Sequence, residues 1–158
     1  MKQAILTALL LASSSCVTAS EPAVPYPDGY RDWHHVKSMV IEEGHPLHSA
    51  FGGSHHIYAN DKALEGYRSE RFPNGSVIIF DLLESVRAGN ALSEGSRKVL
   101  GVMHKNTQAY AATGGWGFEG FAAGDRNSRV VGADAASACF ACHQPQAHQD
   151  FTFSKRRD

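Results

Sequence analysis

Hydrophobic residues recur along this chain in short runs that are bounded by turn-forming residues, and this pattern is typical of β-strands. The run SVIIFDLLES at 76–85 gives the strongest strand signal, because branched and aromatic side chains dominate it. Five further segments have strand composition: 33–41, 55–59, 97–105, 116–122 and 150–154. We therefore expect about five or six antiparallel strands with short helices, an α+β class that is mainly β.

Polar stretches between the strands predict two or three helices. Residues 60–67 predict a short helix with Asn60 or Asp61 as its N-cap. Residues 106–113 predict a second helix, which the two glycines that follow would end. A C-terminal helix is expected to begin near Ala133. The sequence contains no internal repeat, so these elements are expected to form one domain.

The alternation of side chains indicates which residues share a face of the predicted sheet. In the strand at 76–83, Phe80 shares its face with Ile78 and Leu82 and therefore points into an apolar layer. Apart from one serine and one aspartate, this strand is apolar on both faces, which fits either a covered sheet or a dimer interface. By the same alternation, His55 shares its face with the apolar residues of its own strand.

The N-terminal residues 1–19 have the features of a signal peptide. A positively charged start precedes an apolar core at 4–12, and small residues at 17–19 fit a cleavage site. The apolar core is too short to span a bilayer as a helix. Lipidation at Cys16 is an alternative, but the serines before it make a poor lipoprotein signal. We expect export to the periplasm and a mature domain at 20–158.

The balance of charge excludes some classes of partner. The formal net charge is −1, so we expect neither nucleic-acid binding nor electrostatic attachment to a membrane. A basic cluster at 155–157 is interpreted as a solvated tail.

The sequence Cys-Phe-Ala-Cys-His contains Cys139, Cys142 and His143 and predicts covalent attachment of one haem c. The spacing lets two thiols reach the vinyl groups of one haem edge, while the next residue places an imidazole under the iron. Cleavage after residue 19 would remove the third cysteine, and a disulfide between the remaining two is the alternative in an oxidising compartment. A structural zinc site requires four ligands, and the sequence has no second cysteine pair.

His143 would fill one axial position of the iron, so the function depends on what occupies the other. Electron-carrying cytochromes often use His and Met, yet the 15 residues after His143 contain no methionine. Met39 and Met103 lie in predicted strands, where packing is the usual role. His148 would lie on the same side of the haem as His143. Ligation by two histidines stays open, with seven other candidates: His34, His35, His45, His48, His55, His56 and His104.

The absence of an obvious second ligand favours a five-coordinate haem. A four-helix-bundle cytochrome would provide one, but it needs long helices with a 3.6-residue period. The β-rich segments of this chain exclude that fold. The ordered segments YRDWHHVKSMV, HHIYANDKALEGYRSERFPNGSVIIFDLLE, GGWGFEGF and CFACHQPQAHQDFTFSK instead resemble the cytochrome P-460 family, and most closely its cytochrome c′-beta branch. The resemblance covers nearly all of the expected mature chain.

The resemblance implies a specific reading of three positions. Hydroxylamine-oxidising members of the family carry a lysine that is cross-linked to the haem, and Phe80 stands at that position here. A distal carboxylate of those enzymes falls near Gly101, and a distal arginine of the family falls at His55. The phenylalanine at position 80 and the glycine at position 101 both depart from the oxidising enzymes. They favour the branch without a cross-link, which binds small gases beneath aromatic rings. Members of the family are commonly homodimers.

We therefore expect a pocket for NO or CO, with Phe51, His55 and Phe80 as its distal candidates. A phenyl ring offers bound O2 no hydrogen-bond donor, so such a pocket should disfavour O2. Ordinary core packing is the alternative for each of these residues.

Two other functions stay open. One is oxidation of hydroxylamine or NO, or a peroxidase activity with His55 as acid and base; the other is electron transfer with a redox partner protein. Three lysines could reach a haem edge if the alignment shifts: Lys37, Lys98 and Lys105.

Overall fold

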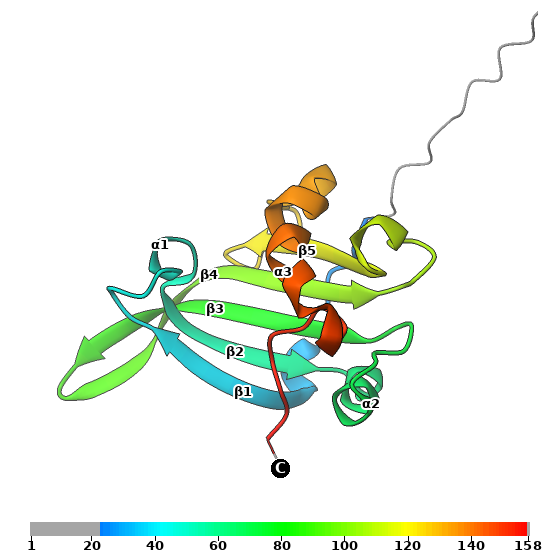
Figure 1. Ribbon diagram of the computed structural model, residues 1–158. Helices are drawn as coiled ribbons and strands as arrows, with labels where there is room; N and C mark the ends of the chain where they lie inside the picture. Colours follow the sequence, from blue (N-terminus) through cyan, green and yellow to red (C-terminus); the bar gives the residue numbers. More distant parts are fainter. Residues whose placement is uncertain (1–22, 158) are drawn as a thin grey trace, which may run out of the picture.

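The computed structural model describes residues 23–157, and the predictions for the signal peptide and for Cys16 lie outside them. A five-stranded antiparallel sheet forms its centre, in which each strand pairs with its neighbour in the sequence (Figure 1). This confirms the predicted class, α+β and mainly β. The strands are β1 (His34–Ile41), β2 (Gly53–Ala59), β3 (Val77–Ala88), β4 (Ala91–Lys105) and β5 (Trp116–Ala122).

Strands β3 and β4 form a hairpin that extends past the rest of the sheet. Their register runs from Val77 opposite His104 to Ala88 opposite Ala91. The two residues between them, Gly89 and Asn90, have φ angles of 56° and 60°. A two-residue turn with two positive φ angles matches the right-handed twist of the strands, which explains this tight connection.

Short helices connect the strands. The helix α2 (Asp61–Ser69) begins where the sequence predicts, because the side chain of Asn60 accepts a hydrogen bond from the Ala63 amide at 2.9 Å. The helix expected at 106–113 is reduced to the 3₁₀ turn η2 (Ala111–Thr113). Two further turns are α1 (His48–Phe51) and η1 (Tyr30–Asp32).

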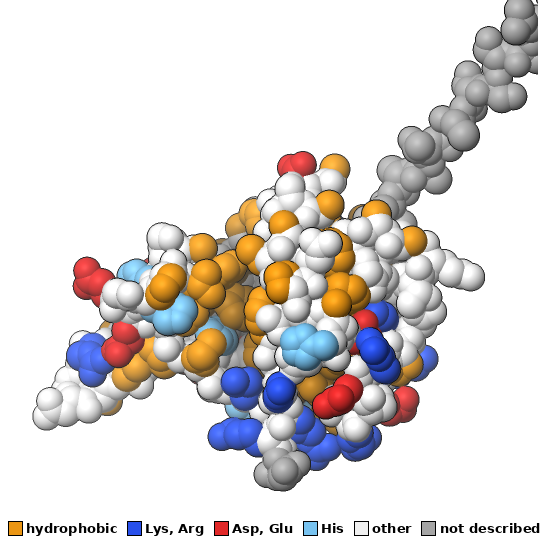
Figure 2. All heavy atoms as spheres, in the orientation of Figure 1, with side chains coloured by type: hydrophobic (Ala, Val, Ile, Leu, Met, Phe, Trp, Pro, Cys, Tyr) orange, Lys and Arg blue, Asp and Glu red, His pale blue; other side chains and the backbone are white. Residues whose placement is uncertain are grey.

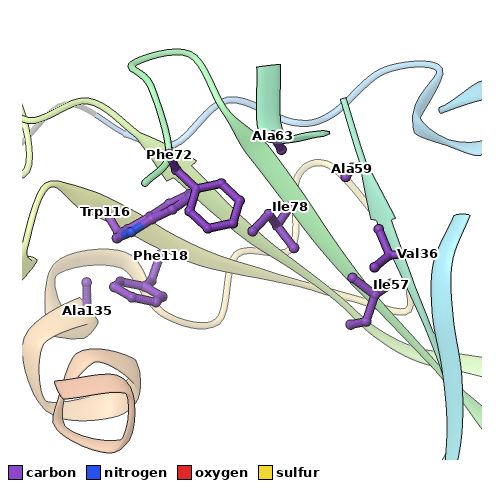
Figure 3. Close-up of a cluster of buried hydrophobic side chains, with 9 residues drawn as sticks. All are labelled: Val36, Ile57, Ala59, Ala63, Phe72, Ile78, Trp116, Phe118 and Ala135. Atoms are coloured by element: carbon purple, nitrogen blue, oxygen red, sulfur yellow. The ribbon is translucent and has the colours of Figure 1, made fainter. Parts of the chain in front are cut away.

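Each face of the sheet is covered by a different part of the chain. The front face, which is turned to the viewer in Figure 1, lies under α2 and the C-terminal helical segment. Its core comprises Val36, Ile57, Ala59, Ala63, Phe72, Ile78, Trp116, Phe118 and Ala135 (Figure 3). The back face packs against residues near the N-terminus, and its core comprises Val24, Tyr30, Ile79, Leu100, Val102, Tyr110 and Phe121. The first part of β3, Val77–Leu83, is thus covered on both faces, as in a covered sheet, whereas residues 84–88 are mostly exposed.

The C-terminal helical segment (132–149) contains the helix expected near Ala133, but it is irregular. It consists of the 3₁₀ turn η3 (Gly132–Asp134), the π-helical turn η4 (Ala136–Phe140), α3 (Ala141–His143) and the 3₁₀ segment η5 (Gln144–Gln149). Among the described residues, no helix has the length and apolar composition required to cross a membrane.

The strand predicted at 150–154 is wrong. Asp150 and Phe151 have φ angles of 50° and 64°, a left-handed conformation that turns the chain out of the extended path. The Asp150 carboxylate accepts hydrogen bonds from the Phe72 amide at 2.8 Å and from Lys105 Nζ at 2.7 Å. These bonds to side-chain atoms replace the backbone ladder that a strand would have formed.

Candidate haem site

The cysteines of the motif lie one helical turn apart on the C-terminal helical segment. Cys139 is half-buried and packs against the front-face core, whereas Cys142 is exposed. Neither forms a disulfide with another described residue. Burial raises the pKa of the Cys139 thiol to about 11, with smaller contributions from Glu119 and Cys142. Side chains three residues apart on a helix share one side, so both thiols can reach the same ligand edge.

His143 follows the second cysteine and is held in one orientation. Its Nδ1 lies 2.7 Å from the backbone oxygen of Phe151, and a carbonyl can only accept, so Nδ1 carries the proton. The rings of Phe118 and Phe153 flank the imidazole at centroid distances of 5.0 and 4.9 Å. Burial lowers the pKa of His143, and the hydrogen bond to Phe151 opposes this effect. Nε2 is therefore left with a lone pair, as a ligand to iron requires.

The carbonyl of Phe151 is a functional group that the sequence does not reveal. It faces His143 because Asp150 and Phe151, neither of them glycine, adopt left-handed conformations. No sequence pattern predicts this turn. The aromatic run FTF at 151–153 was the only signal in that region, and it favours a strand.

A row of paired residues across the front face places two glycines next to Phe80. Ile57 is opposite Phe80 in β2, Phe80 is opposite Gly101 in β4, and Gly101 is opposite Gly120 in β5. A Cβ atom at Gly101 would lie 3.3 Å from the Phe80 Cβ atom, which is a tight contact. Gly101 therefore lets Phe80 lie close to β4, whereas Gly120 is covered by Val130, which a Cβ atom there would approach to 2.7 Å.

The three distal candidates lie in one aromatic cluster. The rings of Phe51 and Phe80 meet edge to face at 5.8 Å, and the rings of His55 and Phe80 lie 4.7 Å apart. Phe51 is 41% exposed and Phe80 is half-buried. Figure 2 shows hydrophobic side chains gathered in a recess of this face, between the α1 end of the sheet and the C-terminal helical segment.

Phe51 reaches this cluster from α1, through a connection that holds the loop against the sheet. Lys98 Nζ donates a hydrogen bond to the Gly52 carbonyl at 2.6 Å. Gly53 has a φ angle of 128°, and a Cβ atom there would overlap the Leu83 carbonyl oxygen. Gly53 therefore allows a close approach to β3, and this approach places Phe51 beside Phe80.

His55 is the most deeply buried member of the cluster, with an exposed fraction of 3%. Its Nδ1 has no hydrogen-bond partner among the described residues. Burial, with smaller repulsion from His56 and Lys37, lowers the pKa of His55 to about 4. The imidazole is therefore neutral at physiological pH, and its ring packs against that of Phe80.

Two of the three lysines considered for a cross-link are already engaged. Lys98 binds the Gly52 carbonyl, and Lys105 is buried with its Nζ bonded to Asp150 and to the Gly114 carbonyl. Lys37 lies half-buried on the edge strand β1, opposite Ile57.

The other candidates for a second axial ligand are spread over the molecule. Met39 is opposite His55 on β1 and is 46% exposed, whereas Met103 packs against the front-face core. His104 packs against Tyr110 of the back-face core at a ring distance of 6.1 Å. His56 binds Ser38 and lies 2.7 Å from a carboxylate oxygen of Glu94. These contacts give His56 and His104 roles away from the recess.

The donor set fits a haem. Two thiols on one side of a helix are followed by an imidazole whose Nδ1 is engaged and whose Nε2 faces no hydrogen-bond partner among the described residues. Aromatic and aliphatic side chains around the recess supply the apolar surroundings that a porphyrin requires. An open arrangement of this kind would otherwise leave Phe51 and Phe153 exposed to water, at 41% and 57%.

Comparison with known proteins agrees with this chemistry. Residues 27–154 match the family model described as Cytochrome P460. A search of curated proteins finds no match to the chain. The family match covers the whole sheet, the aromatic cluster and the cysteine–histidine motif, so this chain belongs to the cytochrome P460 family and is a haem-binding cytochrome.

Proposed function

We propose that this protein is an exported cytochrome with one covalently attached haem c that binds small gases, NO and CO above all, in an aromatic-capped pocket. Within the family, the proposal corresponds to the cytochrome c′-beta branch. It separates this chain from members that oxidise hydroxylamine and from electron-carrying cytochromes.

The attachment would use Cys139 and Cys142 as thioether donors and His143 Nε2 as the proximal ligand. A ferrous haem with one free axial position supplies the capacity to bind NO and CO. The protein would hold the imidazole by the hydrogen bond from Nδ1 to the Phe151 carbonyl. A bond of this type fixes the ring and raises its basicity as a ligand.

The observation that carries the proposal is the composition of the cluster on the front face. Phe51 and Phe80 meet edge to face, and the neighbour of Phe80 across the sheet is Gly101. The cluster thus presents phenyl rings where cross-linked relatives would need an amine, and a glycine where they would need a carboxylate. Neither phenyl ring can form a covalent bond to the haem or donate a hydrogen bond.

The environment of His55 also supports a preference for NO and CO over O2. A bound O2 gains most from a hydrogen-bond donor beside it. His55 is neutral, is only 3% exposed and packs against the ring of Phe80, so its ring has little access to a ligand in the recess. The pocket should therefore favour NO and CO over O2, and it provides no acid for peroxide chemistry.

Absorption and EPR spectra of the resting and dithionite-reduced protein, with and without NO, test the proposal. We expect a high-spin five-coordinate haem, a ferrous Soret band at the position of ordinary haem c, and a normal pyridine haemochrome after denaturation. A low-spin six-coordinate spectrum would instead favour electron transfer. A strongly red-shifted ferrous Soret band would indicate a cross-linked haem and an oxidising enzyme.

The proposal includes a periplasmic location and a homodimer. Strand β1 is an edge of the sheet, and its side chains Met39 and Val40 are 46% and 40% exposed, which supports a contact with a second copy. Light scattering of the purified protein should give twice the mass of one chain. A monomeric mass at micromolar concentration would exclude the dimer but leave the haem chemistry untouched.

A further inference from the structure

The turn that follows the C-terminal helical segment bears directly on His143. Its Nδ1 donates to the Phe151 carbonyl at 2.7 Å, so the direction of that carbonyl sets the direction of the imidazole. Phe151 and the preceding Asp150 both have left-handed backbone conformations, with φ angles of 64° and 50°. Two consecutive non-glycine residues in this region persist only when their surroundings hold them there.

Asp150 is held by three separate parts of the sheet structure. Its Oδ2 accepts the Phe72 amide at 2.8 Å, and its Oδ1 accepts from Lys105 Nζ at 2.7 Å. Its own backbone carbonyl accepts from Trp116 Nε1 at 2.8 Å. The bonds come from the segment after α2, from the end of β4 and from the start of β5. They leave the turn no freedom to rotate without breaking a buried bond.

Lys105, the partner of the Asp150 carboxylate, is itself buried and fixed by further contacts. Its side chain is 5% exposed, and Nζ also donates to the Gly114 carbonyl at 3.1 Å while it lies 4.9 Å from the centre of the Trp116 ring. A buried ion pair contributes little net stability, because desolvation of both charges offsets their attraction. Such a pair is better explained by the single geometry that it enforces.

We propose that Lys105 and Asp150 are positioning residues for the proximal haem ligand. The buried pair fixes the left-handed turn, the turn aims the Phe151 carbonyl at Nδ1, and this bond sets the orientation and basicity of the His143 imidazole. The inference rests on the proposed ligation of haem by His143. It also gives Lys105 a role that excludes it as a cross-linking lysine.

The test removes the ion pair without leaving an unpaired buried charge. The double variant Lys105→Met/Asp150→Asn keeps an oxygen for the Phe72 amide and keeps the Asp150 backbone carbonyl. Resonance Raman spectra of the ferrous haem-loaded protein report the iron–histidine stretch. We expect a downshift and broadening of this band, because the imidazole loses a fixed acceptor and its basicity falls. Lys105→Arg preserves the charge pair and should keep the band of the wild type.

A matched variant separates positioning from stability. Arg97→Met/Asp81→Asn removes a partly buried ion pair on the back face, where Arg97 Nε lies 2.6 Å from Asp81 Oδ1. It should lower the melting temperature but leave the iron–histidine band unchanged. An unchanged band in the Lys105→Met/Asp150→Asn protein would overturn the proposal, as would an equal shift in the back-face variant.

If the double variant does not accumulate, Asp150→Asn alone provides the same readout with a smaller expected downshift. An unchanged band in this single variant would also overturn the proposal. Failure of the proposed haem ligation is recognised separately, because the wild-type protein would then lack an iron–histidine band altogether.

Discussion

The two faces of the sheet are built from the same strands but differ in how their polar and aromatic side chains are covered. On the back face, the buried Asp81 carboxylate is saturated by Tyr30 at 2.7 Å and by Arg97 at 2.6 Å, with Arg31 at 3.5 Å. On the front face, phenyl rings are partly exposed and His55 Nδ1 has no described partner. One face completes a core, and the other leaves a core to be completed by a ligand.

This difference locates stability and function in different layers. A polar network around the buried Asp81 carboxylate holds Tyr30 on the back face. An apolar recess with few satisfied polar groups is a poor surface for water but a suitable one for a porphyrin. Substitutions on the two faces should therefore separate folding from ligand binding.

The largest effect is expected from Asp81→Ala on the back face. The substitution leaves Tyr30 and Arg97 without their shared acceptor, and breaking a buried pair typically costs about 3–5 kcal/mol. Urea unfolding monitored by circular dichroism should show this loss, while the Soret spectrum of the folded fraction stays that of the wild type. Arg31→Ala is the matched control, since Arg31 is 58% exposed and its loss should cost less than about 1 kcal/mol. A changed Soret band in the Asp81 variant would mean that the faces are not independent.

A second effect is the loss of stability in acid that His55 should cause. The pKa of His55 is about 4 in the folded protein against an ordinary 6.5, mainly because of burial. Between these values the unfolded chain binds a proton at His55 and the folded protein does not. The contribution of His55 is therefore present above pH 6.5 and lost as the pH falls towards 4, and it amounts to roughly 3 kcal/mol.

The variant His55→Phe removes this titration and tests the sign. Its free energy of unfolding should fall less between pH 7 and pH 5 than that of the wild type. The same substitution at exposed His45 is the control and should leave the wild-type pH dependence in place. An identical pH dependence in His55→Phe and wild type would contradict the burial of a neutral imidazole at this position.

Local patterns were sufficient to predict most of the sheet. The strand at 76–85 and the Asn60 cap depend on neighbouring residues only, and both are confirmed. The alternation that placed Phe80 with Ile78 also holds, because both residues belong to the front-face cluster. Phe51, His55 and Phe80 lie together as expected, and Phe51 sits on a short helix between the first two strands.

The support for His143 could not be predicted. The bond between Lys105 and Asp150 joins residues 45 apart in the sequence, and neither residue carries a local signal for the other. The FTF run favours a strand by composition, but two left-handed residues and long-range bonds from Asp150 override that preference. Non-local contacts of this kind decide the geometry of a site after local propensities have decided the elements.

A third effect is expected on ligand affinity from Phe80→Ala. Removing the ring opens the recess and should raise the affinity for CO by about tenfold, which corresponds to about 1.4 kcal/mol. The stability cost should stay below that of a fully buried phenylalanine, because Phe80 is half-buried. Ile79→Ala is the matched control on the back face, where Ile79 is 0% exposed. It should cost about 2–5 kcal/mol of stability with no change in CO affinity. Equal affinity in the Phe80 variant and the wild type would show that Phe80 does not cap the ligand.

The smallest effect is expected from Gly101→Ala, which tests the role of the missing side chain beside Phe80. The new Cβ atom would lie 3.3 Å from the Phe80 Cβ atom and would push the ring towards the recess. CO affinity should fall by about threefold, less than 1 kcal/mol. Gly95→Ala in the same strand is the control: its Cβ atom would meet Val86 at 2.9 Å, in the outer part of the β3–β4 hairpin. Laser-flash rebinding of CO measures both variants. If Gly101→Ala and Gly95→Ala change the rebinding rate equally, the missing side chain at Gly101 has no special relation to the pocket, and the front face is open for some other reason.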